Sequence, residues 1–198
     1  MKPTLFFVLI PLLITTSVNA QASKKYQKLR KNYHYREGYI ITKDSTKITG
    51  LIKYSIYFEA KKYGLVNFVH TDGKKRKYYP KDLNGYGHSI HKFVSDNSRF
   101  YEIVQTGKNI GLYKNISVTS WSTPGPNGTG PMTYSSSDES LYVKRSMDNS
   151  FKLVRKKKFK EEFSRYFEDC PALSSEIQHG RLTHEDISRI VIQYNHCK

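Results

Sequence analysis

The chain has 198 residues and a formal net charge of +16, from 33 Lys and Arg against 17 Asp and Glu. This length allows one domain with a hydrophobic core, or one such domain with a helical appendage, and excludes an array of large domains. The charge bears on solubility and on association with anions, and by itself it defines no site. Sixteen tyrosines, together with threonine and β-branched residues, favour a strand-rich fold.

Residues 1–20 have the pattern of a secretory signal peptide. Lys2 forms a basic start, residues 5–14 form an apolar run too short to span a bilayer comfortably, and a Val-Asn-Ala ending suits cleavage after Ala20. An uncleaved anchor is the alternative, and the short apolar run disfavours it. The signal-peptide pattern leads us to expect an exported protein, periplasmic or extracellular. No later run is long and apolar enough to span a bilayer, so we expect no transmembrane segment after signal cleavage.

Residues 21–36 are basic and show no clear period, so we predict a mobile N-terminal arm. From residue 37 to residue 155, short β-branched or alternating runs separated by turn residues predict an antiparallel β domain. The predicted strands are residues 38–42, 47–54, 64–70, 74–79, 90–94, 100–105, 110–113, 141–145 and 151–155, with residues 116–120 continuing the seventh strand after a kink.

Three connections in this domain carry distinct signals. Asp72-Gly73 is the strongest hairpin signal in the chain, so the strands on either side of it are predicted to pair. Residues 82–87 contain two glycines and are predicted to form a turn-rich crossing. Residues 121–139 are rich in Pro, Gly and Ser and offer little to bury, so we predict a long flexible loop.

Residues 156–198 carry three predicted short helices. Thr183 and Asp186 form an N-cap pair before the third helix, and Asp169 is predicted to cap the second. Helices this short need a partner surface, so we predict a C-terminal helical unit packed on the β domain. Apolar residues recur at helical spacing along each of them: Phe159, Phe163, Tyr166 and Phe167, then Leu173 and Ile177, then Ile187, Ile190, Val191 and Tyr194.

The order of strands followed by helices gives the fold class α+β. Within it we predict an antiparallel β-rich sheet or partly open barrel, followed by the short C-terminal helical unit.

Cys170 and Cys197 are the only two cysteines, and they stand at the predicted start of the second helix and the end of the third. In an exported protein two cysteines are expected to pair, and the chain-entropy treatment gives roughly 3–4 kcal/mol for a loop of this length. The alternative is a reactive thiol at Cys170, near a helix N-terminus. A metal site is disfavoured because there is no C-x-x-C motif and no second cysteine pair.

Five stretches spread over most of the chain form a pattern. They are residues 38–41 (Gly-Tyr-Ile-Ile), 50–54 (Gly-Leu-Ile-Lys-Tyr), 79–86 (Tyr-Pro-Lys-Asp-Leu-Asn-Gly-Tyr), 169–173 (Asp-Cys-Pro-Ala-Leu) and 190–197, where Ile-Val precedes Tyr-Asn-His-Cys. In these stretches, and most specifically in the last two, the chain resembles a family of uncharacterised exported proteins common in Bacteroidota-type bacteria. The resemblance implies export and a β-then-helix architecture, and it carries over no activity and no functional residue. The Pro/Gly/Ser-rich stretch at residues 121–139 resembles an insertion peculiar to this chain.

The sequence shows no assembled catalytic or metal-binding motif. The H-E-x-x-H and G-x-S-x-G patterns and the phosphate-binding glycine patterns are absent. His88 and His91 lie three residues apart at a turn-to-strand junction, with no Glu or Cys at ligand spacing, so surface histidines are a better interpretation than a zinc site. We therefore predict no catalytic residue, no metal site and no cofactor.

Two basic clusters are the candidate anion-binding residues. Such clusters attract phosphates, sulfates and carboxylates. The alternative, a solvated basic surface that keeps a tyrosine-rich protein soluble, is favoured on charge balance alone. The candidates are Lys74, Lys75, Arg76 and Lys77 in the first cluster, and Arg155, Lys156, Lys157 and Lys158 in the second.

These observations lead to three functional hypotheses. The preferred one is an exported, non-enzymatic binding or structural module of the cell envelope with an unknown ligand. The second is a binder of anionic polymers or lipid head groups through the basic clusters, whose partner would be an anionic envelope polymer or lipid. The third, a secreted hydrolase, is disfavoured because no catalytic constellation can be assembled. Clustering of the two basic groups on one face would favour the second hypothesis.

Overall fold

The structure is a computed structural model that describes residues 22–54, 61–126 and 130–197. The predicted signal peptide, residues 1–20, lies outside these ranges. Among the helices of the described ranges, none combines the length and the apolar character needed to cross a bilayer.

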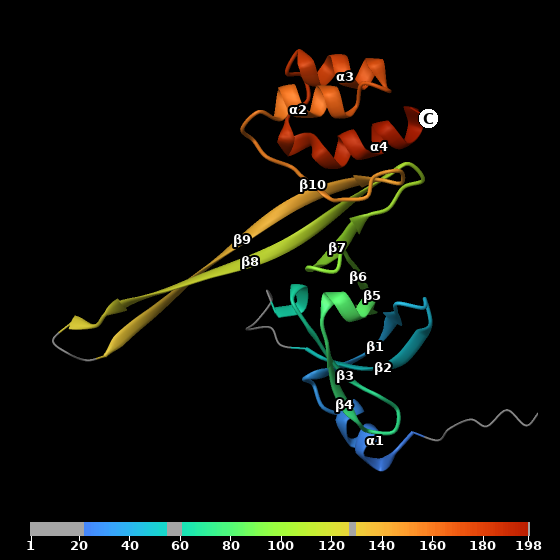
Figure 1. Cartoon of the computed structure of the whole chain (residues 1–198), viewed down its shortest axis with the longest axis vertical. Helices are drawn as coiled ribbons and strands as arrows, with labels where there is room; N and C mark the ends of the chain where they lie inside the picture. The colour runs from blue at the N-terminus through green and yellow to red at the C-terminus, as the bar shows by residue number, and fades with distance from the viewer. Residues whose placement is uncertain (1–21, 55–60, 127–129, 198) are drawn as a thin grey trace, which may run out of the picture.

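The described strands form one antiparallel sheet whose order is β10-β9-β8-β7-β6-β5-β1-β2-β3-β4 (Figure 1). The sheet is open, with β4 and β10 at its two edges, so the predicted α+β class is confirmed and the sheet does not close into a barrel. The strands are β1 (Tyr35–Thr42), β2 (Lys47–Lys53), β3 (Val66–Val69), β4 (Lys75–Tyr78), β5 (Leu83–His88), β6 (His91–Ser95), β7 (Phe100–Gln105), β8 (Ile110–Pro124), β9 (Pro131–Arg145) and β10 (Lys152–Leu153).

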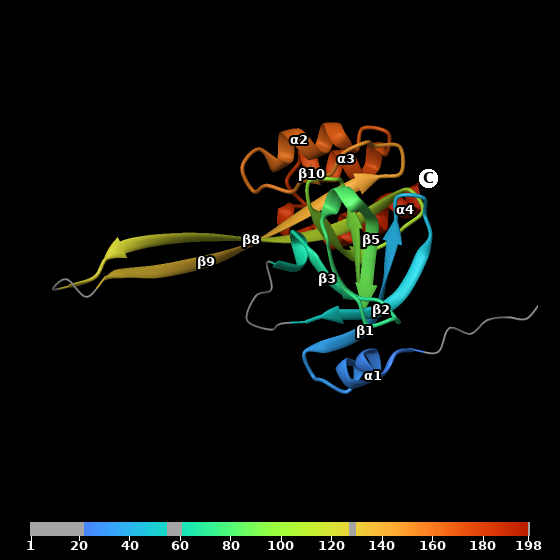
Figure 2. The same ribbon diagram turned by 60° about the horizontal axis from the view of Figure 1, so that its bottom comes forward.

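Helices cover the two ends of this sheet. α2, α3 and α4 gather at the β10 end, while α1 lies at the other end, beside β1 (Figures 1 and 2). The helices are α1 (Lys24–Arg30), α2 (Phe159–Tyr166), α3 (Pro171–Gln178) and α4 (Ile187–Cys197), and two 3-10 turns are η2 (Pro80–Asp82) and η4 (His184–Asp186).

Two hydrophobic cores correspond to the two ends. In the C-terminal core, α2, α3 and α4 pack their apolar stripes against Ile110, Leu112 and Val143 of β8 and β9. The other core fills the curved face of β1–β7. Its buried residues are Ile40, Ile52, Tyr63, Val66, Phe68, Tyr78, Leu83, Tyr86, Phe93 and Phe100.

The C-terminal unit follows the local signals closely. Thr183 and Asp186 form the predicted capping box, in which the Asp186 carboxylate accepts from the Thr183 backbone N–H at 2.8 Å. Cys170 and Cys197 form the predicted disulfide, with Cα atoms 6.0 Å apart. The prediction for Asp169 was wrong: Cys170 occupies the N-cap of α3, and Asp169 instead accepts a hydrogen bond from the Tyr194 hydroxyl at 2.7 Å.

Asn195 fastens α4 to the start of β8. Its Oδ1 accepts from the backbone N–H groups of Asn109 and Ile110 at 2.8 and 3.2 Å. Its Nδ2 donates to the carbonyls of Ile110 and Val191 at 3.0 and 2.8 Å. A glycine is required at position 107, because a Cβ there would stand 2.1 Å from Asn195 Nδ2. The side chain therefore completes the backbone hydrogen bonding of a strand that it does not belong to.

We expect Asn195→Ala to lower the free energy of unfolding by about 1–2 kcal/mol, because it leaves backbone groups of Asn109 and Ile110 without their partner. Urea denaturation followed by far-UV circular dichroism measures this. Ile192→Ala is the matched control, since Ile192 lies on the same helix with 49% of its surface exposed. Equal stability of the two variants would show that the Asn195 contacts contribute nothing net.

Three segments differ from their prediction. Residues 24–30 of the predicted mobile arm form α1, because Ser23 caps a run of good helix formers and its hydroxyl accepts from Tyr26 N at 3.2 Å. The predicted crossing at 82–87 is strand β5. The predicted loop at 121–139 is largely the paired ends of β8 and β9, in register from Ile110↔Arg145 to Pro124↔Pro131. Residues 127–129 of that stretch lie outside the described ranges.

Candidate anion-binding site

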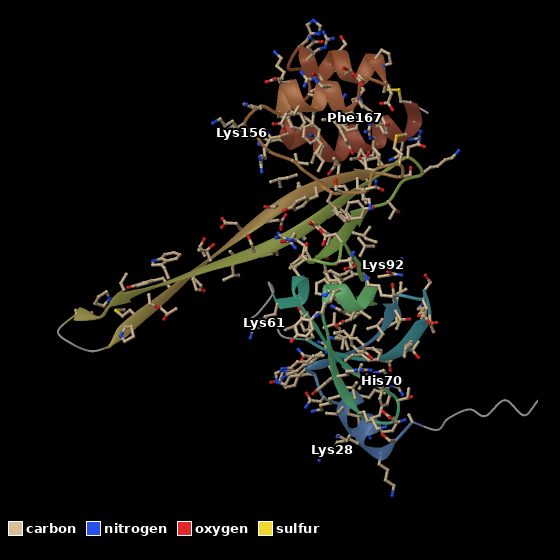
Figure 3. All side chains as sticks on the ribbon, in the orientation of Figure 1. Lys28, Lys61, His70, Lys92, Lys156 and Phe167 are labelled. Carbon is tan, nitrogen blue, oxygen red and sulfur yellow. A yellow bond between two sulfur atoms is a disulfide. The ribbon has the colours of Figure 1, made fainter. Side chains whose placement is uncertain are left out.

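The two predicted basic clusters lie at opposite ends of the molecule. Lys75, Arg76 and Lys77 belong to β4, one edge of the sheet, while residues 155–158 follow β10, the other edge. In Figure 3, Lys156 lies near the C-terminal helices, far from Lys61 and His70. The two clusters therefore lie at opposite edges of the sheet and not side by side.

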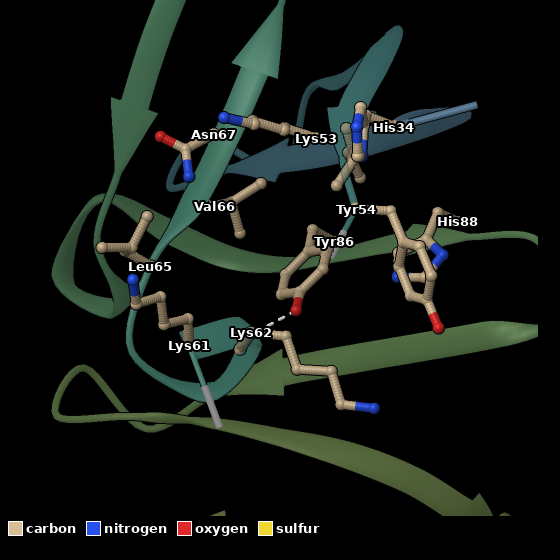
Figure 4. Close-up of a pocket in the computed structure, with 11 residues that line it drawn as sticks. His34, Lys53, Tyr54, Lys61, Lys62, Leu65, Val66, Asn67, Tyr86 and His88 are labelled. Atoms are coloured by element: carbon tan, nitrogen blue, oxygen red, sulfur yellow. Dashed lines mark hydrogen bonds between the residues drawn. The ribbon is translucent and has the colours of Figure 1, made fainter. Parts of the chain in front are cut away.

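A pocket of about 340 Å³ lies near the first cluster, where β2 ends and β3 begins (Figure 4). Lys53, Lys61 and Lys62 line it, and none of its described lining residues is an acid. Three cations around one hollow favour an anionic occupant, because the low-dielectric wall strengthens each charge. The remaining lining residues are His34, Ile52, Tyr54, Leu65, Val66, Asn67, Tyr86 and His88.

The floor of the pocket is aromatic and fixed. The Tyr86 hydroxyl donates to the Lys62 carbonyl at 2.6 Å, which holds the 61–63 turn against β5 (Figure 4). The Tyr86 ring stacks on Phe93 with centroids 4.4 Å apart and meets Phe100 edge-on. The backbone that presents Lys61 and Lys62 is therefore anchored to the hydrophobic core.

A second hollow of about 250 Å³ adjoins the pocket and brings in the predicted β4 cluster. Lys53 and Asn67 line both hollows, so the two hollows are adjacent. Asn67 pairs with Lys77 across β3 and β4, which places these side chains on one face of the sheet. Lys75 and Arg76 also line the second hollow. The structure thus extends the first predicted cluster into a basic groove.

His88 is the buried group of the pocket. Only 5% of its surface is exposed, and its Nδ1 has no hydrogen-bond partner among the described residues. Its strand partner is Gly38, where a Cβ would come within 3.2 Å of the His88 Cβ, so the glycine permits this packing. The interpretation of His88 as a surface histidine was wrong.

Burial, followed by the positive charge of its neighbours His91 and Lys62, lowers the pKa of His88 to about 4. The imidazole is therefore neutral near pH 7. An unsatisfied buried nitrogen costs about 1–3 kcal/mol, which a ligand that bonds to it would recover.

Glu102 holds the polar side of the curved face together. Its carboxylate accepts from the Tyr63 hydroxyl at 2.9 Å and from His91 Nδ1, and it lies 3.6 Å from Lys62 Nζ and 3.8 Å from Lys114 Nζ. Burial raises the pKa of Glu102, but these hydrogen bonds and cations outweigh it and lower the pKa overall. Glu102 therefore stays ionised and fixes Lys62 at the pocket wall.

Sequence reasoning missed the main lining residues. Lys53, Lys61 and His88 come from three segments that the β1–β2, β1–β5 and β2–β3 pairings bring together. The one local signal was the Lys61-Lys62 pair after β2, which resembles any exposed basic dipeptide. Among the described residues, no group of three or more His, Cys, Asp or Glu could hold a metal ion.

Comparison with known proteins finds no matching family model, curated protein or solved structure.

Proposed function

We propose that the protein is an exported, non-enzymatic module of the cell envelope that binds an anionic polymer in the groove formed by the two hollows. The observation that carries the proposal is a pocket lined by Lys53, Lys61 and Lys62 and by His88, whose buried Nδ1 has no partner among the described residues. Surface lysines alone would support only solubility. A buried polar atom without a partner is different, because folding leaves such atoms unsatisfied only rarely.

The shape of the groove favours a polymer over an isolated ion. The first hollow, of about 340 Å³, can take one sugar-sized unit, and the second, of about 250 Å³, lies beside it on β3 and β4. Cations lie along both hollows: Lys53, Lys61 and Lys62 in the first, and Lys75 and Lys77 further on. Aromatic faces such as Tyr54 offer stacking surface for sugar rings. An acidic glycan carries both repeated negative charges and sugar rings, so it suits several cations beside an aromatic face.

Replacing Lys53 and Lys61 together by Gln is expected to weaken binding of a heparin hexasaccharide at least about tenfold. Hydrogen bonds to charged groups contribute about 1.5–3 kcal/mol each, and 1.4 kcal/mol corresponds to a factor of ten. The matched control is Lys156→Gln with Lys157→Gln, which removes the same charge at the far edge of the sheet. Isothermal titration calorimetry at two salt concentrations measures both variants.

The control variant is expected to bind within about twofold of wild type. It loses only the long-range attraction of two distant charges, and salt screens that attraction. Equal weakening of the two double variants would mean that net charge alone draws the glycan, and it would contradict a site in the groove. Binding to anionic lipid vesicles, with none to the hexasaccharide, would move the ligand class from glycan to lipid head group.

A further inference from the structure

The outer ribbon, residues 117–124 of β8 and 131–138 of β9, projects away from the rest of the molecule (Figures 1 and 2). All of its residues are exposed, and the two hydrophobic cores hold none of them. Eight cross-strand pairs join the two strands, from Ser117↔Asp138 to Pro124↔Pro131. At about 3.3 Å per residue the ribbon extends over about 25 Å.

The two faces of the outer ribbon differ. One face carries Trp121 stacked on Tyr134, with centroids 6.1 Å apart, and Met132 beside them. These three side chains are 49%, 44% and 45% exposed. The other face carries Val118 and then hydroxyl residues, such as the Ser120↔Ser135 pair. A lone two-stranded hairpin is marginally stable in water, and three or more strands with an apolar face are needed for independent stability.

Both edges of the outer ribbon are open within the described residues. β7 pairs with β8 only as far as Lys114, and β10 pairs with β9 only at Tyr142 and Val143. Natural edge strands are normally protected from pairing by lysines, prolines or bulges. This chain has 33 Lys and Arg, yet none lies between Lys114 and Lys144. Lysine protection is therefore missing from the longest open edges of a very basic protein, and the prolines of the ribbon, Pro124 and Pro131, stand at its outer end.

We propose that the outer ribbon pairs with the outer ribbon of a second copy of this chain, β8 edge against β8 edge, antiparallel about Ser120. The result is a four-stranded sheet shared by two protomers, with Ser120 opposite its own copy and Trp121 opposite Thr119 of the partner. The pairing is isologous, so one open edge satisfies the other, as a two-fold dimer requires. It extends the main-chain ladder of each ribbon at its open edge, as in recognition by strand addition.

The β8 edge suits this pairing better than the β9 edge. Its residues 117–124 carry no charge and include Val118, Thr119, Trp121 and Thr123, which favour strands. The β9 edge carries Asp138 and a run of serines. Charge also selects a second copy over an anionic membrane, because the ribbon has no Lys or Arg to meet phosphate head groups.

The length of the ribbon keeps the two basic protomers far enough apart that their electrostatic repulsion is weak. An antiparallel overlap of the ribbons leaves the two strongly basic bodies at opposite ends of the shared sheet. A separation of tens of ångströms exceeds the Debye length of about 8 Å at physiological salt, so the bodies scarcely repel each other. This inference does not rest on the proposed glycan site, and its test uses no glycan.

The test compares two variants that differ only in the edge they occupy. Ser120→Lys places two like charges opposite each other in the proposed dimer, and it is expected to raise the dimer dissociation constant at least about tenfold. Ser135→Lys puts the same charge on the same ribbon face, on the cross-strand partner of Ser120, and is expected to leave the dimer intact. Sedimentation equilibrium of each variant and of wild type gives the dissociation constants.

A mixing experiment guards against a folding defect in the variant. Ser120→Lys and Ser120→Glu are each expected to be monomeric alone, and their equimolar mixture is expected to form a mixed dimer, because opposite charges then face each other. Trp121 is the only tryptophan, so its fluorescence reports on the ribbon directly and should shift to shorter wavelength on association.

Three results would overturn the proposal. The first is a wild type that stays monomeric at every concentration. The second is a Ser120→Lys variant that dimerises as well as wild type. The third is a Trp121 emission shift that occurs with lipid vesicles and is absent on self-association, which would assign the ribbon to a membrane surface.

Discussion

Replacing Cys170 and Cys197 together by Ala is expected to lower the free energy of unfolding by about 3.5 kcal/mol. The disulfide closes a loop with a sequence separation of 27, and the chain-entropy treatment gives about this value for that length. The loop contains α3, η4 and α4, and its residues from Cys170 onward make up eight of the fourteen buried residues of the C-terminal core. Loss of the bond should therefore loosen the helices that cover β8 and β9. Urea denaturation at neutral pH, without reductant, measures the loss.

The same experiment in reducing buffer is the control. There the wild type should fall to within about 1 kcal/mol of the Cys170→Ala, Cys197→Ala variant, since only the difference between buried Cys170 and alanine remains. A variant as stable as the oxidised wild type would contradict the expectation. It would show that packing of α4 against β8, through residues such as Asn195, already restrains the loop.

The C-terminal unit was predictable because its signals are local. Thr183 and Asp186 cap one helix from three residues apart, and Ile187, Ile190 and Val191 define one face of it. None of these inferences depends on a distant segment. The Asp72-Gly73 turn is similar, since β3 and β4 pair across it as predicted. Where the residues that determine a local structure lie within a short stretch of chain, that structure can be predicted from the sequence.

β5 was mistaken for a turn because its glycines serve neighbours that are distant in sequence. A Cβ at Gly85 would lie 2.3 Å from the Phe93 carbonyl oxygen, and one at Gly87 would lie 2.7 Å from the Tyr39 ring. Glycine in a strand often marks such a close approach, and glycine in a turn supplies positive φ. The two uses look the same in sequence, and only the pairing of β5 with β1 and β6 separates them.

The long ribbon was missed for a different reason. Residues 121–139 do offer little to bury, as their composition indicates, and all of the described ones except Gly125 are exposed. They form strands because the pairing of β8 with β9 continues outward from the buried pair Leu112↔Val143. Composition measures what a segment can bury and says nothing of a ladder extended from elsewhere. The open ladder is also the reason to expect a second copy beside it.

The burial of His88 was equally hidden, and it has the clearest consequence for pH dependence. We expect wild-type stability to fall by about 2.5 kcal/mol as the pH drops from about 6.5 to about 4. The folded-state pKa of His88 is about 4, below the unfolded value of 6.5, so the unfolded chain binds the proton first in this window. Stability rises with pH wherever the unfolded state binds more protons, and the contribution is complete above pH 6.5. One pKa unit corresponds to about 1.4 kcal/mol, and the loss is smaller than the full shift because the unfolded group at pH 6.5 and the folded group at pH 4 are each half protonated.

The charged groups around His88 define the window further. His91, Lys62 and Arg36 oppose its protonation, and only Glu102 favours it. The pKa of Glu102 is itself lowered, so Glu102 keeps its stabilising charge to a lower pH than an ordinary carboxylate does. The step between pH 6.5 and 4 therefore belongs mainly to the histidine.

His88→Gln is the variant that isolates this step, because glutamine keeps a polar side chain of similar size and does not titrate. Its stability should be nearly flat between pH 6.5 and about 4.5, while the wild type declines over the same range, with both measured by urea denaturation at closely spaced pH values. His179→Gln is the control, since His179 is exposed at the end of α3 and should leave the wild-type decline unchanged. Parallel curves for wild type and His88→Gln would show that the ring accepts its proton inside the folded pocket. In that case an anion bound beside Lys53 and Lys61 would meet a charged imidazole, and glycan binding should tighten as the pH falls.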